Sequence, residues 1–212
     1  MELIVKNLTK KFDNNIILDN INFKLTAGHI YGFVGRNGSG NSVLMKIICN
    51  FYTPTEGEIL LDGENYIQKN SFPKETRSLI ESPHFIPNIS GFENLKILAS
   101  IQNKIGEKEI VYWFKRLNLE KEKDKLYSKY SLGMKQKLGI IQVLMENPKL
   151  IILDEPFNGI EEETVKKIKE ILIEEKKKNK IIIIASHIKE DIEYLSDVIY
   201  KIDDGKLYQV EK

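Results

Sequence analysis

The chain has 212 residues, of which 42% are hydrophobic and 30% charged, enough to form one sizeable core in one globular domain. The 32 basic residues nearly balance the 31 acidic ones, and the net charge of +1 gives no electrostatic case for a nucleic-acid partner. The longest apolar runs are strand-sized, far below the roughly 18 residues that span a bilayer. The N-terminus lacks the features of a signal peptide, and the single Cys49 suits a reducing compartment. We therefore expect a cytoplasmic protein with no direct membrane insertion.

The first third of the chain predicts strands that lead into a glycine-rich turn and a helix. Strands are predicted at 2–8, 17–25 and 29–35, and the last runs into the sequence GRNGSGNS at 35–42. Residues 42–51 then have helical length and no breaker. A turn, a strand and a second turn follow within 53–66, and another short strand ends near 78–83.

Helical patterns dominate the middle of the chain. They lie at 90–102, 107–119 and 132–147, and Ser90 with Glu93 forms a capping-box pattern at the first of them. Alternating strands and helices then resume: strand 149–156, helix 161–178, strand 181–187, helix 188–196 and a pair of strands within 197–209. The two strands of continuous apolar residues predict a parallel sheet covered on both faces. The charged run EEKKKNK at 174–180 is interpreted as a solvated helix end.

The glycine-rich turn has the spacing of a phosphate-binding loop. Strand, turn and helix is the context that such a loop requires, because the backbone N–H groups of the turn and of the helix N-terminus point at the anion. Gly35, Gly38 and Gly40 allow close approach, and Ser42 can supply a hydroxyl to Mg²⁺. A purely structural glycine turn is the alternative. The loop departs from the pattern at Asn41, where lysine is expected.

Two adjacent carboxylates follow the first of the later apolar strands. The sequence LIILDEP places Asp154 and Glu155 at the end of a buried strand. There Asp154 can hold the magnesium shell, and Glu155 can take a proton from an attacking water. Together with an upstream phosphate loop, the pair predicts a nucleotide-hydrolysing site.

These residues resemble the ATP-binding subunits of ABC transporters over essentially the whole chain. The most specific element is YSLGMKQKL at 130–138, a variant of the family's signature motif in which Ser131 and Gly133 match while Leu132 and Met134 depart. The sequence LIESPHFIPNISGFENL at 79–95 resembles the bacitracin and lantibiotic-immunity exporters, in which Glu81 stands where most relatives have glutamine. A generic multidrug exporter is the alternative subgroup.

The resemblance implies an α/β fold: a P-loop NTPase (RecA-like) core with an N-terminal antiparallel β subdomain and an inserted α-helical subdomain. We expect a single domain over 1–212, with residues 1–86 and 147–212 in the core and β subdomain and 87–146 in the helical insertion. The family's cofactors are ATP and Mg²⁺. Its subunits form head-to-tail dimers, with themselves or a related subunit, and work with a separate membrane permease at the inner face of the membrane.

The resemblance also implies roles for single residues. Phe12 would stack on adenine, with a core phenylalanine as the alternative, and His187 would sense the γ-phosphate, with a structural histidine as the alternative. Glu161 replaces the usual aspartate of the loop that passes between subunits, with an effect left open. The implied catalytic residues are Glu155, His187 and Glu81, and the implied metal ligands are Ser42, Asp154 and Glu81. The implied nucleotide contacts are Phe12, Gly35, Arg36, Asn37, Gly38, Ser39, Gly40, Asn41, Ser42, Val43, Ser131 and Gly133.

Asn41 predicts an impaired site. Losing a buried charge-assisted contact costs about 2–5 kcal/mol, and losing a donor to developing charge slows catalysis roughly a hundred- to a thousand-fold. Two other basic residues are not expected to replace the missing lysine. Arg36 is at a position whose side chain usually faces away from the phosphates in this family, and Lys46 lies too far along the helix to reach them. Three functions stay open: an exporter's ATPase subunit, a nucleotide-binding regulatory module that hydrolyses nothing, and a soluble ABC protein not tied to transport.

Overall fold

A computed structural model describes residues 1–36 and 38–210. The strands are β1 (Glu2–Phe12), β2 (Asn15–Thr26), β3 (His29–Val34), β4 (Glu56–Leu61), β5 (Thr76–Leu79), β6 (Leu150–Asp154), β7 (Ile181–Ala185), β8 (Val198–Asp203) and β9 (Lys206–Val210). The α-helices are α1 (Asn41–Ile48), α2 (Gly91–Gln102), α3 (Glu107–Arg116), α4 (Leu132–Leu144), α5 (Glu162–Lys177) and α6 (Lys189–Leu195), with 3₁₀ turns at Glu120–Glu122 and Tyr127–Lys129. No helix among these residues is long and apolar enough to cross a membrane.

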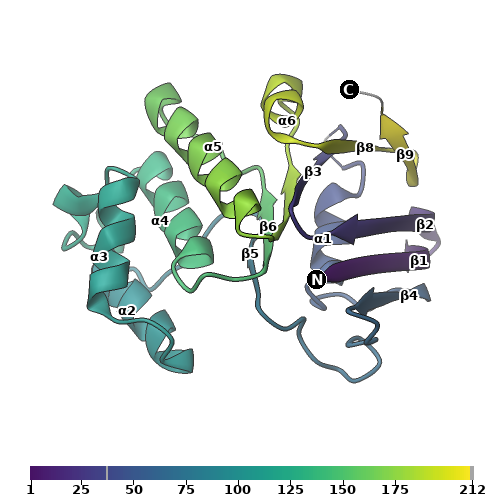
Figure 1. Ribbon diagram of the computed structural model, residues 1–212, viewed down its shortest axis with the longest axis horizontal. Coiled ribbons are helices and arrows are strands. Elements are labelled where there is room, and N and C mark those ends of the chain that lie inside the picture. Colours follow the sequence, from purple (N-terminus) through teal and green to yellow (C-terminus); the bar gives the residue numbers. More distant parts are fainter. Residues whose placement is uncertain (37, 211–212) are drawn as a thin grey trace.

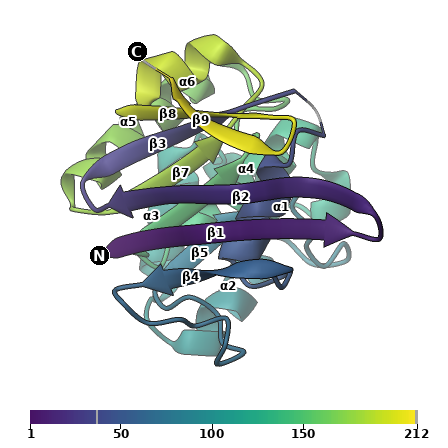
Figure 2. The same ribbon diagram turned by 90° about the vertical axis from the view of Figure 1, so that its right-hand side faces the viewer.

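Two sheets organise the fold (Figures 1 and 2). The strands β2, β1 and β4 form a small antiparallel sheet, and β5, β6, β7, β3, β8 and β9 form a larger one in that order. In the larger sheet only β9 runs antiparallel to its neighbour. The predicted α/β fold with an N-terminal antiparallel subdomain is confirmed.

The central strands are buried on both faces, as their apolar runs predict. All residues of β6 and β7 are buried. Ile151 and Leu153 face one core cluster with helices α4 and α5, whereas Leu150 and Ile152 face a second cluster with α1 and the small sheet. Helix α1, which follows the glycine loop, is therefore packed between the two sheets.

Helices α2, α3 and α4 pack together at the end of the molecule opposite the small sheet (Figure 1) and are called the helical group below. The predicted capping box is present, because Ser90 Oγ accepts from the Glu93 N–H at 3.1 Å and the Glu93 carboxylate accepts from the Ser90 N–H at 2.8 Å. The boundaries of this group as an inserted subdomain stay a prediction.

Several helices end earlier than their apolar patterns predict, and asparagine supplies the reason. Asn50, Asn118 and Asn147 follow α1, α3 and α4 with φ values of 56°, 53° and 53°, in the left-handed region that asparagine tolerates better than most residues. The predicted helices at 42–51, 107–119 and 132–147 each ran to or past such a residue. A left-handed residue stops the helix even where the apolar pattern continues.

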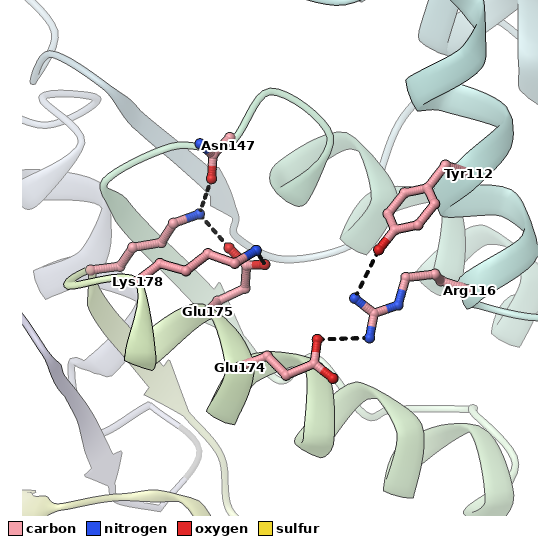
Figure 3. Close-up of polar contacts among 7 residues, drawn as sticks. Tyr112, Arg116, Asn147, Glu174, Glu175 and Lys178 are labelled. Carbon is pink, nitrogen blue, oxygen red and sulfur yellow. Dashed lines mark hydrogen bonds and ion pairs between the residues drawn. The ribbon is translucent and has the colours of Figure 1, made fainter.

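The charged run at 174–180 is not simply a solvated helix end, and that prediction is wrong at two positions. Glu175 and Lys180 are only 1% and 3% exposed. Lys180 Nζ lies against the Glu175 carboxylate and 2.6 Å from Asn147 Oδ1. Lys178 Nζ lies 2.6 Å from Glu175 Oε1 (Figure 3). The end of α5 packs against the turn after α4, so the side chains on that face are buried and paired.

Candidate nucleotide-binding site

A pocket of about 490 Å³ lies where parallel strands β3, β5, β6 and β7 end, at the carboxyl edge of the larger sheet. Open α/β sheets place their ligand sites at this edge, and the volume lies within the usual range for small-ligand pockets. The lining consists of Gly35, Arg36, Gly38, Ser39, Gly40, Asn41, Ser42, Val43, Glu81, Ser82, Leu132, Gln136, Asp154, Glu155, Asn158 and Ala185. The glycine loop, the residues after β5 and the two carboxylates thus meet in one place.

The glycine loop at 35–42 is shaped by its glycines. Gly38 and Gly40 have φ values of 83° and 108°, which disfavour any side chain. A Cβ at Gly35 would overlap the Ser39 hydroxyl, so the loop closes tightly on itself. Among the described residues no side chain caps α1, so the helix N-terminus is left for a ligand. Asn37, which the sequence also placed in this site, lies outside the described residues.

Asn41 changes the polarity of the loop interior. Its Oδ1 and the Ser39 Oγ are buried atoms with no hydrogen-bond partner among the described residues. Buried polar atoms normally have partners, so the loop interior is suited to a polar ligand. Arg36 also lines the pocket.

Three oxygen-bearing side chains suit a magnesium ion. Ser42 Oγ donates to Asp154 Oδ2 at 2.5 Å, and Glu81 lines the same pocket. Burial raises the pKa of Asp154, the Glu155 and Glu81 carboxylates add to the rise, and the Ser42 hydrogen bond opposes it. Within 1–36 and 38–210, no cluster of three or more His, Cys, Asp or Glu forms a metal site. Ser42, Asp154 and Glu81 supply the oxygen ligands that suit Mg²⁺, which typically takes one or two carboxylates and completes its shell with phosphates and water.

Glu155 is held firmly by neighbouring groups. Its Oε1 accepts from the His187 backbone N–H at 2.9 Å and lies 2.8 Å from His187 Nδ1, while its Oε2 accepts from Ser186 Oγ at 3.3 Å. Gln136 Nε2 donates to the Glu155 carbonyl at 3.0 Å. The backbone of Glu155 has a φ of 48°, an uncommon conformation that these contacts maintain. The carboxylate therefore has a fixed direction beside the loop.

Several predicted site residues do not line this pocket. Phe12 is 39% exposed, with its ring edge-on to Tyr52 at 5.6 Å, so the core alternative for Phe12 is wrong. His187 reaches the pocket only through Glu155. Ser131 caps α4 by accepting from the Met134 N–H at 3.3 Å. Gly133 lies so close to the Gly159 carbonyl that a Cβ would overlap it.

Sequence reasoning assigned no role to Gln136, Ser186 and Ser82, and it dismissed Lys46; it placed Asn158 in the loop that passes between subunits. Ser186 directly precedes His187 at the end of an apolar strand, and this position could have indicated that Ser186 lies beside the site. Gln136 reaches a residue 19 positions away on another element, and no local pattern indicates that contact.

The comparisons with known proteins agree on one family. A family model described as "ABC transporter" matches residues 18–158. The chain is 41% identical to the uncharacterized ABC transporter ATP-binding protein YybJ of Bacillus subtilis (strain 168), over 98% of this chain and 95% of YybJ. It is 37% identical to the bacitracin transport ATP-binding protein BcrA of Enterococcus faecalis, over 99% of this chain and 69% of BcrA. It is 33% identical to the lantibiotic transport ATP-binding protein SrtF of Streptococcus pyogenes, over 97% of this chain and 88% of SrtF.

Solved structures agree on the fold. The ATP-binding subunit of an ABC transporter superposes with a TM-score of 0.89 at 24% identity, over 99% of this chain and 90% of that one. The ATP-binding cassette MJ0796, in a dimeric post-hydrolysis state bound to ADP and Pi, superposes with a TM-score of 0.86 at 21% identity, over 99% of each chain. The fold, the pocket with its loop and paired carboxylates, and the matched sequences establish that this chain belongs to the ABC transporter family as an ATP-binding domain.

Proposed function

We propose that this chain couples ATP binding and hydrolysis to export through a separate membrane permease, and that the exported compound is a peptide antibiotic or a similar molecule. The observation that carries the proposal is the convergence of the glycine loop with Asp154 and Glu155, with Ser42 Oγ 2.5 Å from Asp154 Oδ2. The substrate class rests on the relatives named for bacitracin and lantibiotic transport.

In this proposal the loop holds the phosphates of ATP. Gly35, Gly38 and Gly40 let the backbone approach the anion, and the N-terminus of α1 adds its partial positive charge. Ser42, Asp154 and Glu81 would hold Mg²⁺, which when bound neutralises phosphate charge. Arg36, Asn37, Ser39, Asn41 and Val43 complete the loop's contacts, and Phe12 supplies a half-exposed ring for adenine.

Glu155 is the proposed general base. Its carboxylate lies at the pocket wall, and three donors already direct it. A base must lie within hydrogen-bond reach of the water proton that it removes. His187, which is half exposed and bonded to Glu155, both orients this carboxylate and can contact the terminal phosphate.

The proposed active unit is a head-to-tail dimer. Ser131 and Gly133 lie at the start of helix α4 and do not line the pocket of their own subunit, although Leu132 between them does. A helix N-terminus favours an anion, so these residues would cover ATP bound to the loop of a second subunit, identical or related. Glu161 pairs with Lys137 at 3.5 Å and is 70% exposed, free to contact that partner.

The proposed permease site is a groove of about 510 Å³ between the loop after β5 and the helical group. It is lined by His84, Phe85, Ile86, Pro87, Asn94, Ile97, Leu98 and Gln142. Ile86 and Ile97 are 50% and 47% exposed, an apolar surface suited to a helix of the permease. Binding there would place the chain at the inner face of the membrane.

Asn41 favours a second candidate, a nucleotide-binding module that hydrolyses nothing. Without the lysine ammonium the phosphates lose a full positive charge, and the buried Oδ1 of Asn41 is an acceptor. In the first proposal the chain has a weakened ATPase site. In the second, Asn41 is the working state, and replacing Glu155 by glutamine leaves the cellular function unchanged.

Calorimetric titration of Mg-ATP into the protein, Asn41→Lys and Asn41→Met tests the proposal. We expect Asn41→Lys to bind at least roughly 30-fold more tightly, the factor for about 2 kcal/mol. Asn41→Met, which matches the lysine stem without its charge, should bind no better than the parent. Equal and tight binding by all three would favour the module that hydrolyses nothing, and no binding by any would overturn both functions.

A further inference from the structure

Lys46 forms an ion pair with Glu81 at the edge of the candidate site. The Nζ of Lys46 lies 2.5 Å from Glu81 Oε1. Lys46 stands four residues after Ser42 on α1, on the same helix face, and its side chain is only 20% exposed. The ammonium also lies 5.3 Å from the centre of the Tyr52 ring. The lysine dismissed by sequence reasoning therefore reaches the site through Glu81.

Glu81 is held in an uncommon backbone conformation. Its φ is 63°, in the left-handed region that glutamate rarely adopts. Such residues persist where surrounding contacts over-determine them, and they gather at functional sites. The Lys46 ion pair joins the Glu81 side chain, which is 63% exposed, to α1.

The loop at 80–89, which begins with Glu81's neighbour Ile80, is also held by hydrogen bonds farther along. Tyr127 Oη donates to the Pro83 carbonyl at 2.6 Å. Asn94 accepts from the Ile86 N–H at 2.8 Å and donates to the Ile86 carbonyl at 3.0 Å. These contacts tie the far part of the loop to α2 and to the 3₁₀ turn at Tyr127–Lys129, whereas Lys46 ties its near part to α1, the helix that follows the glycine loop.

The charges around the pocket place Lys46 in competition with a metal ion. Glu81, Glu155 and Asp154 converge there, and the Lys46 ammonium acts on Asp154 as well as on Glu81. A divalent cation held by Ser42, Asp154 and Glu81 would need the same Glu81 carboxylate and would be repelled by the ammonium. One carboxylate thus faces two cations.

We propose that Lys46 is a positioning residue that holds the Glu81 carboxylate in an ion pair while the site is metal-free. Mg²⁺ that binds with nucleotide would then replace the Lys46 ammonium as the partner of this carboxylate. The inference rests on the proposed function of the site and deepens it. The exchange releases the near part of the 80–89 loop from α1, while Asn94 still holds the far part at Ile86.

The test measures how much Mg²⁺ raises the affinity for a non-hydrolysable ATP analogue, as the ratio of dissociation constants in EDTA and in Mg²⁺. All variants carry Asn41→Lys so that nucleotide binding is saturable. We expect the ratio to rise about 3- to 10-fold in Lys46→Met, because the metal no longer displaces a cation. Lys46→Arg should keep the parental ratio, since it keeps the charge. Lys149→Met is the matched control, because Lys149 pairs with Glu75 at 2.7 Å away from the pocket.

A second pair of variants shows whether Lys46 acts through Glu81. In a Glu81→Gln background, Lys46→Met should leave the ratio nearly unchanged, because the contested carboxylate is gone. An unchanged or lower ratio in Lys46→Met alone would overturn the inference, as would an equal rise in both backgrounds. Failure of every variant to bind the analogue would overturn the proposed function and this inference with it, whereas nucleotide binding that is indifferent to Lys46 overturns this inference alone.

Discussion

Asp154 is a carboxylate whose surroundings favour a cation. Its side chain is buried, with 6% of the residue exposed, and the pKa of the group is raised by burial and by the neighbouring Glu155 and Glu81. The Ser42 hydroxyl donates to it at 2.5 Å but brings no positive charge. A group arranged in this way favours ligand binding over the stability of the fold.

Asp154→Asn should raise the free energy of unfolding at pH 7 in metal-free buffer. The folded pKa lies above the unfolded value of about 3.9, so the stability that the carboxyl contributes is present below that value and is lost as pH rises through the folded pKa. Asparagine cannot ionise and can still accept from Ser42. Urea denaturation between pH 4 and 8 should show the difference shrinking as pH falls toward about 4. A variant less stable than the parent at pH 7 would contradict this account.

At the scale of single elements, the end of α5 depends on a buried ionic network. Glu175 accepts from Lys178 at 2.6 Å (Figure 3). It also accepts from Lys180, which in turn donates to Asn147. Burial alone would raise the pKa of Glu175, but the two lysine contacts outweigh it and lower the pKa. The network joins α5, β7 and the turn after α4.

Glu175→Ala should destabilise the fold by roughly 3–5 kcal/mol, because it leaves the buried Lys180 ammonium without its carboxylate. The double variant Glu175→Leu with Lys180→Met should recover most of the loss, since no charge is then buried. Glu174→Ala is the control: its partner Arg116 lies 2.9 Å away in a partly exposed pair, which is worth at most about 1 kcal/mol. Equal losses in Glu174→Ala and Glu175→Ala, measured by urea denaturation, would refute the buried network.

At the scale of the whole molecule, the helical group contacts the rest of the chain at points around the candidate site. Gln136 of α4 donates to the Glu155 carbonyl, and Gly133 packs against the Gly159 carbonyl. Farther away, Arg116 of α3 reaches Glu174 of α5 at 2.9 Å (Figure 3). The start of α4, with the proposed partner-facing residues, is therefore positioned by the loop after Glu155.

Dimer formation should depend on nucleotide and on the loop cation. We expect the parent protein to stay monomeric with Mg-ATP, because weak phosphate binding leaves nothing to join two subunits. Asn41→Lys combined with Glu155→Gln should dimerise with Mg-ATP, since ATP is then bound but loses its general base. Light scattering after size-exclusion chromatography distinguishes the two. Adding Ser131→Glu, which places a negative charge toward the phosphates, should abolish the dimer, and a dimer that persists with it would contradict the head-to-tail arrangement.

Much of the architecture could be predicted from local sequence. The apolar runs at Leu150–Asp154 and Ile181–Ala185 predicted buried strands because continuous apolar residues need cover on both faces. The capping box at Ser90 and the spacing of the glycine loop are likewise local patterns. The helix ends were predicted less well, because asparagine at Asn118 or Asn147 competes with an apolar pattern that continues past it.

The sequence by itself determined the family, the α/β fold and the residue types that the candidate site brings together, since these follow from short motifs with fixed spacing. Only the tertiary structure decided which charges meet. Lys46 and Glu81 are 35 positions apart, and Glu155 and His187 are 32 apart. Glu175 and Lys180 look solvated in sequence but are buried against the turn after α4. Such contacts depend on how packed elements approach one another, a property that no local pattern encodes.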